Sequence, residues 1–254
     1  MGIQVNNSQF HLKNKHTSYI FCVYDNRFLV HLYWGKAMEN DVDLTYFPDT
    51  FISHRTTAFH VPLNSENTGF INDLKMEFSV FGGGDYRIPT FHSKYEDGST
   101  VSEFEYVGYN IIIGKPKLNG LPSTYIEDEN EAQTVEIEFQ DKKTGLHMFL
   151  SYSIFEDYDV ITRNIRYENR GSEKIKLLSA HSACVDFIGN DYKILHLHGD
   201  WLRERSLEFV DVTHGIYTVD SKRGMSSHMN NPFVALMDKN ADEYNGEVYG
   251  FSLV

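Results

Sequence analysis

The chain has 254 residues, of which 41% are hydrophobic and 14% aromatic, so it carries enough apolar material for a sizeable core and is unlike a disordered protein. Its formal net charge is −13, and a field of that sign repels phosphate backbones and anionic lipid. We therefore expect neither nucleic acid nor a membrane as a partner, and no run approaches the roughly 18 apolar residues that a membrane-spanning helix needs.

Apolar and polar residues alternate with a period of two along most of the chain, as in half-buried strands. Residues 19–24 and 28–34 flank Asp25-Asn26-Arg27 and predict a short hairpin. In chain order the further predicted strands are 104–113, 135–140, 146–154, 160–167, 175–188, 193–197, 216–219 and 233–237, with a last strand-like run at 248–254. Turn residues separate them. The pattern predicts an all-β chain, a large antiparallel sandwich with few or no helices.

The segment 38–74 differs from the rest of the chain. It has few alternating runs, and it holds Pro48, Pro62 and clusters of Ser, Thr and Asn. The pattern predicts a long irregular loop on the β scaffold, and long loops in compact domains are usually functional or disordered.

The N-terminus and the two cysteines bear on the cellular location of the protein. The N-terminus lacks a charged region followed by an apolar stretch, which would mark a secretory signal peptide. Cys22 and Cys184 each lie in an apolar strand-like context, so we expect free buried thiols rather than a disulfide. Together these features predict a cytoplasmic protein.

The sequence contains no nucleotide-binding loop with the required spacing and no serine-hydrolase elbow. Gly82-Gly83-Gly84 lacks the spacing of a dinucleotide fingerprint. The run 108–115 has one residue too many between its glycines for a phosphate-binding loop, and Pro116 follows where Ser or Thr is needed. No Gly-x-Ser-x-Gly elbow is present. We expect no cofactor.

Acidic residues are abundant, and cleavage of a glycoside with retention needs two carboxyl groups about 5–5.5 Å apart. Asp157 with Asp159, and Asp85 with Glu77, are candidate pairs, but no spacing singles one out. Asp85 would also face the same side as Arg87 in an extended segment. A structural turn held by that ion pair is favoured over a catalytic role.

Two histidines raise the question of a metal. His196 and His198 alternate on a predicted strand and so share a face. A zinc site needs a third ligand nearby, and no local cluster of Cys, His and carboxylates supplies one. Two hydrogen-bonded histidines are therefore favoured, and we expect no metal.

The segment 199–233 best fits a ligand site. Trp201 lies beside Arg203, Glu204 and Arg205, and sugars place apolar C–H faces on indole rings and hydroxyls on charged groups. A Trp packed under a charged strand edge explains the pattern equally well. The Ser, His and Asn residues at 226–231 suit either a polar ligand or a hydrogen-bonded corner.

Ordered motifs along nearly the whole chain resemble a known family. They are Leu-Tyr-Trp-Gly-Lys at 32–36, Gly-Asp-Tyr-Arg-Ile-Pro at 84–89, Gly-Lys-Pro-Lys-Leu-Asn-Gly-Leu-Pro at 114–122, Trp-Leu-Arg-Glu-Arg at 201–205, Arg-Gly-Met-Ser-Ser-His at 223–228 and Gly-Glu-Val-Tyr-Gly-Phe-Ser-Leu-Val at 246–254. The series resembles the N-terminal region of bacterial α-galactosidases of glycoside hydrolase family 36, the melibiase type.

The resemblance implies that residues 1–254 form an N-terminal β-supersandwich domain that lacks its last strands. In the family this domain precedes a (β/α)₈ barrel that carries the aspartate nucleophile and the aspartate acid/base, and nothing in this chain resembles those segments. The implied parent is a retaining α-galactosidase for melibiose and raffinose-type sugars, often a tetramer. We expect this chain alone to be inactive, with the downstream barrel as its partner.

The resemblance also implies substrate-binding residues. Trp201 matches well and is expected near the sugar. The segment 46–51 matches, more loosely, a region that reaches the pocket of a neighbouring subunit, and this implies Asp49 and Phe51. A departure occurs at 74–81, where the family commonly has a Pro and this chain has Glu77-Phe78.

Two other functions stay open. One is a free-standing carbohydrate-binding module, for which exposed aromatic platforms at Trp201 or Trp34 would argue. The other is a purely structural wedge without ligand contact, whose exposed apolar surface would drive association.

Overall fold

The computed structural model describes residues 2–39, 42–51, 61–63, 67–69, 71–120 and 122–254. Their strands form antiparallel sheets, and the helical part comprises α1 (Phe47–Phe51) and the 3-10 turns η1 (Ile71–Asp73) and η2 (Glu129–Glu131). The all-β prediction is confirmed. None of the described helices is long and apolar enough to cross a membrane. Backbone contacts divide the chain into two compact units, Met1–Asn119 with Thr124–Asp186, and Gly120–Ser123 with Phe187–Val254.

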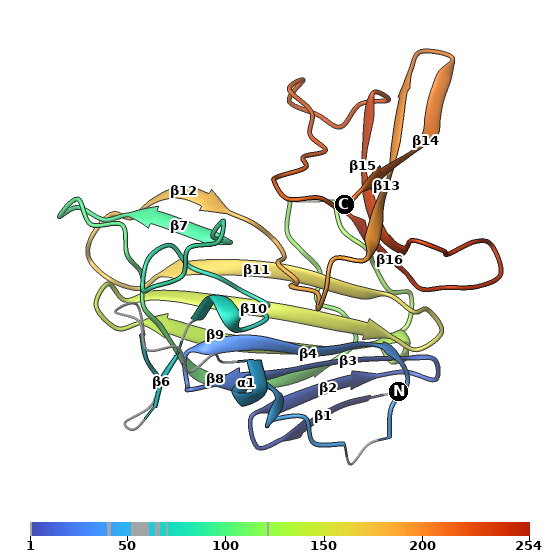
Figure 1. The fold of residues 1–254 in the computed structure, drawn as a ribbon. Coiled ribbons are helices and arrows are strands. Elements are labelled where there is room, and N and C mark those ends of the chain that lie inside the picture. The colour runs from blue at the N-terminus through green and yellow to red at the C-terminus, as the bar shows by residue number, and fades with distance from the viewer. Residues whose placement is uncertain (1, 40–41, 52–60, 64–66, 70, 121) are drawn as a thin grey trace. The chain divides into compact units, whose positions relative to one another are not determined.

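The first sheet of the first unit is a meander in sequence order (Figure 1), made of β1 (Gly2–Asn6), β2 (Gln9–Lys13), β3 (Thr17–Tyr24) and β4 (Phe28–Lys36). The predicted hairpin is confirmed as β3 and β4. Asp25 and Asn26 adopt φ angles of 52° and 54°, because a tight turn between twisted strands favours positive φ, which Asn and Asp tolerate.

The second sheet has the order β11-β10-β9-β8, so β8 and β11 are its edges. The strands are β8 (Phe104–Ile113), β9 (Ala132–Asp141), β10 (Leu146–Phe155) and β11 (Ile161–Asn169). Each lies within a few residues of a strand predicted from the period of two. Along β9 the buried side chains include Val135, Ile137 and Phe139, at every second position, as a strand with one face on the core requires.

The core lies between these two sheets. Phe10, Leu12 and Phe21 come from the first sheet, and Ile137 and Tyr152 from the second, and all are at most 1% exposed. The rings of Phe21 and Tyr152 lie 4.6 Å apart, centroid to centroid. Burial of such side chains contributes about 25 cal/mol per Å² of apolar area. This sandwich therefore holds the first unit together.

The rest of the first unit contains two short pairs, β5 (Val61–Leu63) with β6 (Asn67–Gly69) and β7 (Phe91–Lys94) with β12 (Lys176–Ala180). The prediction of an irregular loop over 38–74 is wrong where α1, β5, β6 and η1 form. Residues 40–41, 52–60, 64–66 and 70 of that segment lie outside the described residues.

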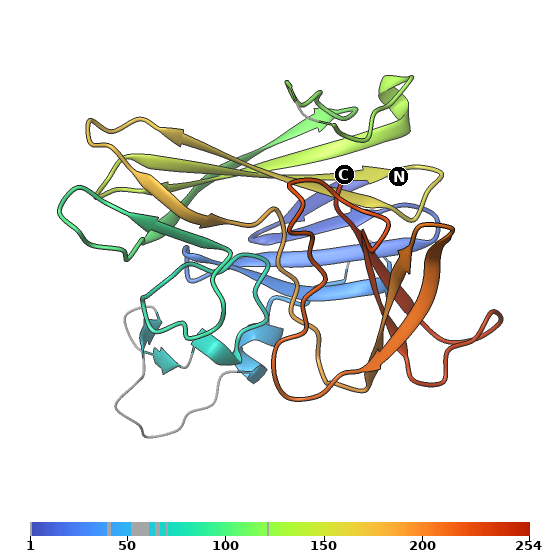
Figure 2. The ribbon, with the colours of Figure 1, turned by 90° about the horizontal axis from the view of Figure 1, so that it is seen from above.

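The second unit is a four-stranded antiparallel sheet of order β14-β13-β15-β16, orange to red in Figure 2. Its strands are β13 (Tyr192–Asp200), β14 (Arg203–Asp211), β15 (Asn230–Asp238) and β16 (Val248–Ser252). Phe187 packs its ring against Tyr249 at 5.0 Å and against Tyr192 at 5.8 Å. The predicted strands 193–197 and 233–237 and the run at 248–254 are found here.

Two strand predictions are wrong, and the hydrogen bonds show why. The strand predicted over 175–188 ends at Ala180, because His181 donates to the carbonyl of Thr90 and the carbonyl of Cys184 accepts from the side chain of Arg163. The strand predicted over 216–219 does not form. Tyr217 is fixed by a hydrogen bond between its hydroxyl and His196, and its backbone joins no strand ladder.

Both cysteines belong to the first unit and both are free thiols, as predicted. Cys22 is buried in β3, and burial raises the pKa of its thiol to about 12. Cys184 is half-buried, and burial, followed by the nearby Asp186 carboxylate, raises its pKa to about 11. Neither group is a reactive thiolate near neutral pH.

Candidate functional site

Asp49 and Phe51 lie on the single turn of α1 in the first unit. Phe47 stacks on Tyr46 with ring centroids 4.7 Å apart and on Phe51 at 6.1 Å. Asp49 is exposed, and its Oδ1 accepts a hydrogen bond from the Tyr24 hydroxyl at 2.7 Å. The turn thus presents aromatic rings beside a carboxylate, a combination that suits a sugar.

Tyr24 of β3, which bonds to Asp49, is a residue of this site that the sequence did not reveal. It ends β3, 25 residues before Asp49, and no local motif links the two positions. Burial raises the pKa of Tyr24, and its hydrogen bond to the Asp49 carboxylate raises it further. The hydroxyl therefore stays protonated and keeps donating to Asp49 throughout the physiological range.

Trp201 lies in the second unit, in the turn between β13 and β14. Its backbone N–H donates to Asp200 Oδ1 at 2.8 Å, and the N–H of Leu202 donates to Glu204 Oε1 at 2.9 Å. Leu202 and Arg205 adopt φ angles of 63° and 61°. Such left-handed residues are strained, and strain of this kind gathers at functional sites.

The indole of Trp201 is 76% exposed, so a Trp packed under a strand edge is not what the structure contains. Around it lie charged and polar groups: His228 Nε2 is 3.6 Å from Asp200 Oδ1. The N–H of Trp201, with His228 and Arg203, lowers the pKa of the Asp200 carboxyl. An open ring beside an ionised carboxylate can take a polyhydroxylated ligand.

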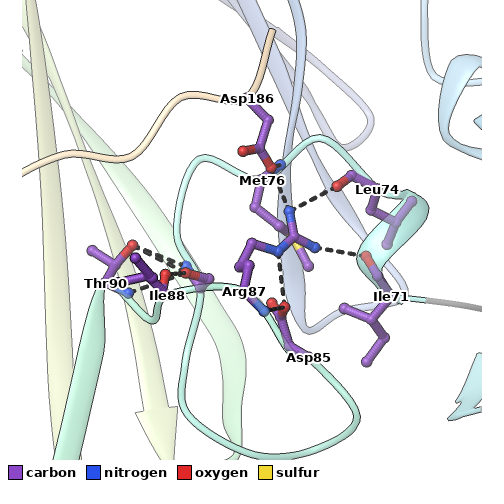
Figure 3. Close-up of polar contacts among 9 residues, drawn as sticks. Ile71, Leu74, Met76, Asp85, Arg87, Ile88, Thr90 and Asp186 are labelled. Atoms are coloured by element: carbon purple, nitrogen blue, oxygen red, sulfur yellow. Dashed lines mark hydrogen bonds and ion pairs between the residues drawn. The ribbon is translucent and has the colours of Figure 1, made fainter. Parts of the chain in front are cut away.

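Arg87 is the centre of a polar cluster in the first unit (Figure 3). Its Nε donates to Asp85 Oδ1 at 2.8 Å, so the predicted ion pair is confirmed. Its terminal nitrogens donate to the backbone carbonyls of Leu74 at 3.0 Å and Ile71 at 2.7 Å. Asp186 forms a second ion pair with it. The guanidinium thus joins three segments, which is a structural role.

A cavity of about 100 Å³ lies beside this cluster. Gly82, Gly83 and Asp85 line it together with hydrophobic side chains, among them Met76 and Phe139. The residues predicted to contact sugar, Trp201, Asp49 and Phe51, are not part of its lining. Its mainly apolar walls do not suit a galactoside.

Glu77 lies at the centre of a second, fully buried cluster. Its carboxylate accepts hydrogen bonds from the hydroxyls of Tyr19 at 2.6 Å and Tyr152 at 3.1 Å. His31 Nδ1 lies 2.6 Å from Oε1, and Arg163 lies 3.0 Å from Oε2. With both oxygens engaged and no exposed surface, Glu77 is a structural acid rather than a catalytic one.

The other acids considered as a catalytic pair also hold structural contacts. Asp157 lies 3.6 Å from the ammonium of Lys15, and both side chains are well exposed. Asp159 accepts a hydrogen bond from Asn14 Nδ2 at 3.3 Å. Asp85, the partner considered for Glu77, is bonded to Arg87. Each of these carboxylates is therefore explained without catalysis.

The two histidines of β13 are hydrogen-bonded, as predicted. His196 Nε2 lies 2.7 Å from the hydroxyl of Tyr217, and His198 Nδ1 lies 3.4 Å from Asn230 Oδ1. In the described part of the chain, no group of three or more His, Cys, Asp or Glu side chains is arranged to hold a metal ion.

A sequence model of the glycosyl hydrolase family 36 N-terminal domain matches residues 27–254. This chain belongs to that family. The resemblance drawn from the ordered motifs is thereby confirmed. The match begins at Arg27, the last residue of the turn between β3 and β4, and so takes in β4 and all later elements.

Solved and curated relatives agree with the family 36 assignment. Alpha-galactosidase AgaA of Geobacillus stearothermophilus is 44% identical over 247 residues, which cover 97% of this chain and 33% of that protein. The crystal structure of AgaB from the same organism superposes with a TM-score of 0.89 at 42% identity, covering 98% of this chain and 34% of that one. A variant of AgaA in complex with raffinose gives 0.86 at 42% identity, covering 95% and 33%.

The family 36 chain described here therefore spans about a third of the length of the relatives it matches. Within it, Asp49 and Phe51 lie in the first unit and Trp201 in the second. The structure brings Asp49 and Phe51 together on one helical turn, and each of the two places offers an aromatic ring with a neighbouring carboxylate.

Proposed function

We propose that this family 36 N-terminal domain is the non-catalytic part of an α-galactosidase that hydrolyses terminal α-galactosides, of the melibiose and raffinose type, with retention. The observation that carries the proposal is the 44% identity to an α-galactosidase over 97% of this chain and 33% of that enzyme. The catalytic aspartates belong to a downstream barrel of the same polypeptide.

In this proposal the domain supports the barrel and a homo-tetramer and lines the sugar pocket with Trp201, Asp49 and Phe51. The exposed indole of Trp201 and the exposed carboxylate of Asp49 support that role. Variants of AgaA have been crystallised with raffinose and with stachyose, and both names support an α-galactoside as the ligand here.

We place the enzyme in the cytoplasm. The two free thiols support a reducing compartment, because a chain exposed to oxidants gains from pairing its cysteines. Neither nucleic acid nor membrane belongs to the proposal, since a net charge of −13 repels both.

The deciding experiment compares two polypeptides. The 254-residue chain alone should release no galactose from melibiose above a blank, and the longer polypeptide that carries it should. Hydrolysis by the 254-residue chain would refute the proposal, because its catalytic acids would then lie within residues 1–254.

Substitution of Trp201 tests the pocket role in the longer polypeptide. Trp201→Ala should raise KM for raffinose and leave the oligomeric state unchanged. The matched control is Tyr244→Ala, which removes another ring of the same unit that is 89% exposed and should leave KM unchanged. Unaltered kinetics for Trp201→Ala would remove this residue from the proposed pocket.

The second candidate is a carbohydrate-binding module that acts on its own. The open indole of Trp201 favours it, since exposed rings are common platforms for sugars. Calorimetric titration of the 254-residue chain with galactose and raffinose separates the candidates. Saturable binding supports the module, and its absence supports the accessory domain.

A further inference from the structure

Strand β8 is a long edge strand, and no described strand pairs with its outer side. It runs for ten residues at the end of the order β11-β10-β9-β8, so among the described strands β9 is its one neighbour in the sheet. The N–H of Tyr106 is bonded to the carbonyl of Asn26. Apart from their ladder with β9, residues 107–113 make no hydrogen bond to another segment among the described residues. Their outer N–H and C=O groups are therefore open to another strand.

Side chains at alternate positions of β8 form an exposed apolar stripe. Val107, Tyr109, Ile111 and Ile113 are 52%, 47%, 37% and 68% exposed. Tyr109 is paired with Ile137, and paired residues share a face of the sheet, so the stripe lies on the core-facing side.

The first sheet covers the stripe only in part: Phe10 of β2 packs edge-on against the Tyr109 ring, with centroids 5.3 Å apart. The edge strand of that sheet is β1, and the N–H of Ile3 in β1 bonds to Gln133 in β9. The outer strand of the first sheet thus lies over β9, and beyond Phe10 and the bond to Asn26 the described residues leave much of this face of β8 open. Apolar residues that would belong to the core are left at the surface, which marks an interaction site.

Natural edge strands are usually protected by charges, prolines or a covering segment. β8 contains one charged residue, Glu105, and no proline, and its register irregularity, a β-bulge between Tyr106 and Gly108, lies near its start and leaves residues 108–113 regular. We propose that β8 pairs antiparallel with β8 of a second copy of this chain, so that the second sheet continues across a two-fold axis. The proposal deepens the proposed homo-oligomer and rests on it.

The charges at the two ends of β8 favour a second copy and an antiparallel arrangement. Glu103 and Glu105 lie at its start, and Lys115 and Lys117 follow its end. A two-fold axis brings the acidic end of one strand to the basic end of the other, as an isologous interface requires. A parallel arrangement would bring like charges together. Lys142 contacts Glu105 within the chain, but that exposed pair is weak and leaves the end acidic.

Placing Asn110 on the axis fixes one register. Tyr109 then lies opposite Ile111 of the partner subunit, and Val107, at the β-bulge, lies near Ile113 of the partner subunit. All four apolar positions of the stripe are matched with one another, and Glu105 lies nearest to Lys115 of the partner subunit. Cross-strand pairs of aromatic and β-branched side chains are the favourable pairs of antiparallel sheets.

Sedimentation of the 254-residue chain tests the interface. The chain should dimerise reversibly, and Ile111→Lys should weaken the dimer by roughly 100-fold or more in Kd, because each dimer would bring two unpaired charges into the interface. The control Ile188→Lys makes the same change at a site in the second unit that is 63% exposed, and it should leave Kd unchanged. Circular dichroism verifies that both variants fold.

Disulfide trapping tests the register. Asn110→Cys should give a covalent dimer on mild oxidation, since directly opposed residues of antiparallel strands lie about 4.5–5.5 Å apart, within disulfide range. Ser172→Cys, at an exposed position away from β8, is the control and should stay monomeric. A wild-type chain that is monomeric at every concentration, or a dimer that Ile111→Lys leaves intact, overturns the proposal. Neither result depends on the galactose-release assay, so a failed interface and a failed enzyme proposal are distinguishable.

Discussion

Glu77 and Arg163 form an ion pair of 3.0 Å inside the first unit, and Arg163 also donates to the backbone carbonyl of Glu77 at 2.8 Å. The carboxylate has no exposed surface, and the guanidinium side chain is 10% exposed. Arg163 belongs to β11, while Glu77 lies outside the strands. The pair thus fixes a segment between η1 and β7 to the second sheet.

Removing one member of this pair should be strongly destabilising. Arg163→Met leaves the buried Glu77 charge uncompensated, and we expect a loss of about 3–5 kcal/mol in the free energy of unfolding. Urea unfolding followed by circular dichroism measures it. Lys15→Met, which breaks an exposed pair with Glu156, is the control and should cost about 0–1 kcal/mol. Equal losses in the two variants would contradict the buried role of Arg163.

Stability should fall in acid because of Glu77. Burial alone raises the pKa of this carboxyl, but Arg163, His31 and Tyr19 outweigh burial and hold it below the ordinary 4.5. The unfolded chain therefore binds this proton more readily than the folded chain does. The contribution of Glu77 is fully present above pH 4.5 and is lost as the pH falls through the folded pKa.

Urea unfolding at a series of pH values checks this. The free energy of unfolding of the wild-type chain should decrease as the pH falls below about 4.5. Glu77→Gln should be less stable near neutral pH and show a shallower decrease in acid. A decrease of the same slope in both chains would assign the acid sensitivity to other groups.

Arg87 should tolerate no shorter cation. Arg87→Lys keeps the charge but loses the fork that reaches Ile71, Leu74 and Asp85 at once (Figure 3). Two backbone carbonyls lose their donor, and we expect a cost of roughly 2–3 kcal/mol in thermal or urea unfolding. Lys174→Arg, the reverse change at an exposed site, should be neutral. A neutral Arg87→Lys would mean that one ion pair is enough to hold this cluster.

Gly199 should resist any side chain. A Cβ there would lie 2.3 Å from the carbonyl oxygen of Arg203 and 2.9 Å from the Cα of Glu204. Gly199→Ala should therefore distort the turn that carries Trp201, at a cost of roughly 1–3 kcal/mol, and shift the tryptophan fluorescence. Gly2→Ala, whose Cβ would meet only the Gln133 side chain at 3.9 Å, should change neither quantity. An unshifted spectrum for Gly199→Ala would show that the turn relaxes elsewhere.

The long strands of the first unit from β3 on were predictable because their signal is local, whereas β1, β2 and the short β5, β6 and β7 were not predicted. Alternation at Val135, Ile137 and Phe139 marks β9, and Asp25 with Asn26 marks the turn between β3 and β4. β14 was missed, since an exposed edge strand with the sequence Arg-Glu-Arg-Ser carries no such alternation. α1 was missed because a helix of five residues is too short to show a period of 3.6.

The polar clusters could not be found in this way. The partners of Glu77 lie 46 to 86 residues away from it in the sequence, and only the folded sheets bring them together. The Asp85–Arg87 pair was predictable because its members are two positions apart, whereas Asp186 joins Arg87 from 99 residues away. For the same reason Tyr24 gave no sign of its bond to Asp49.

The two thiols of the first unit can report on its local unfolding. Cys22 lies in β3, packed in a hydrophobic cluster with Val30, Leu74 and Met76, and burial raises the pKa of its thiol to about 12. An alkylating reagent at neutral pH therefore reaches it when this cluster opens. Cys184, with a pKa of about 11, reports in the same way on the segment held by Arg163. The rate at which each thiol is labelled therefore measures the opening of a known part of the molecule, with no probe to introduce.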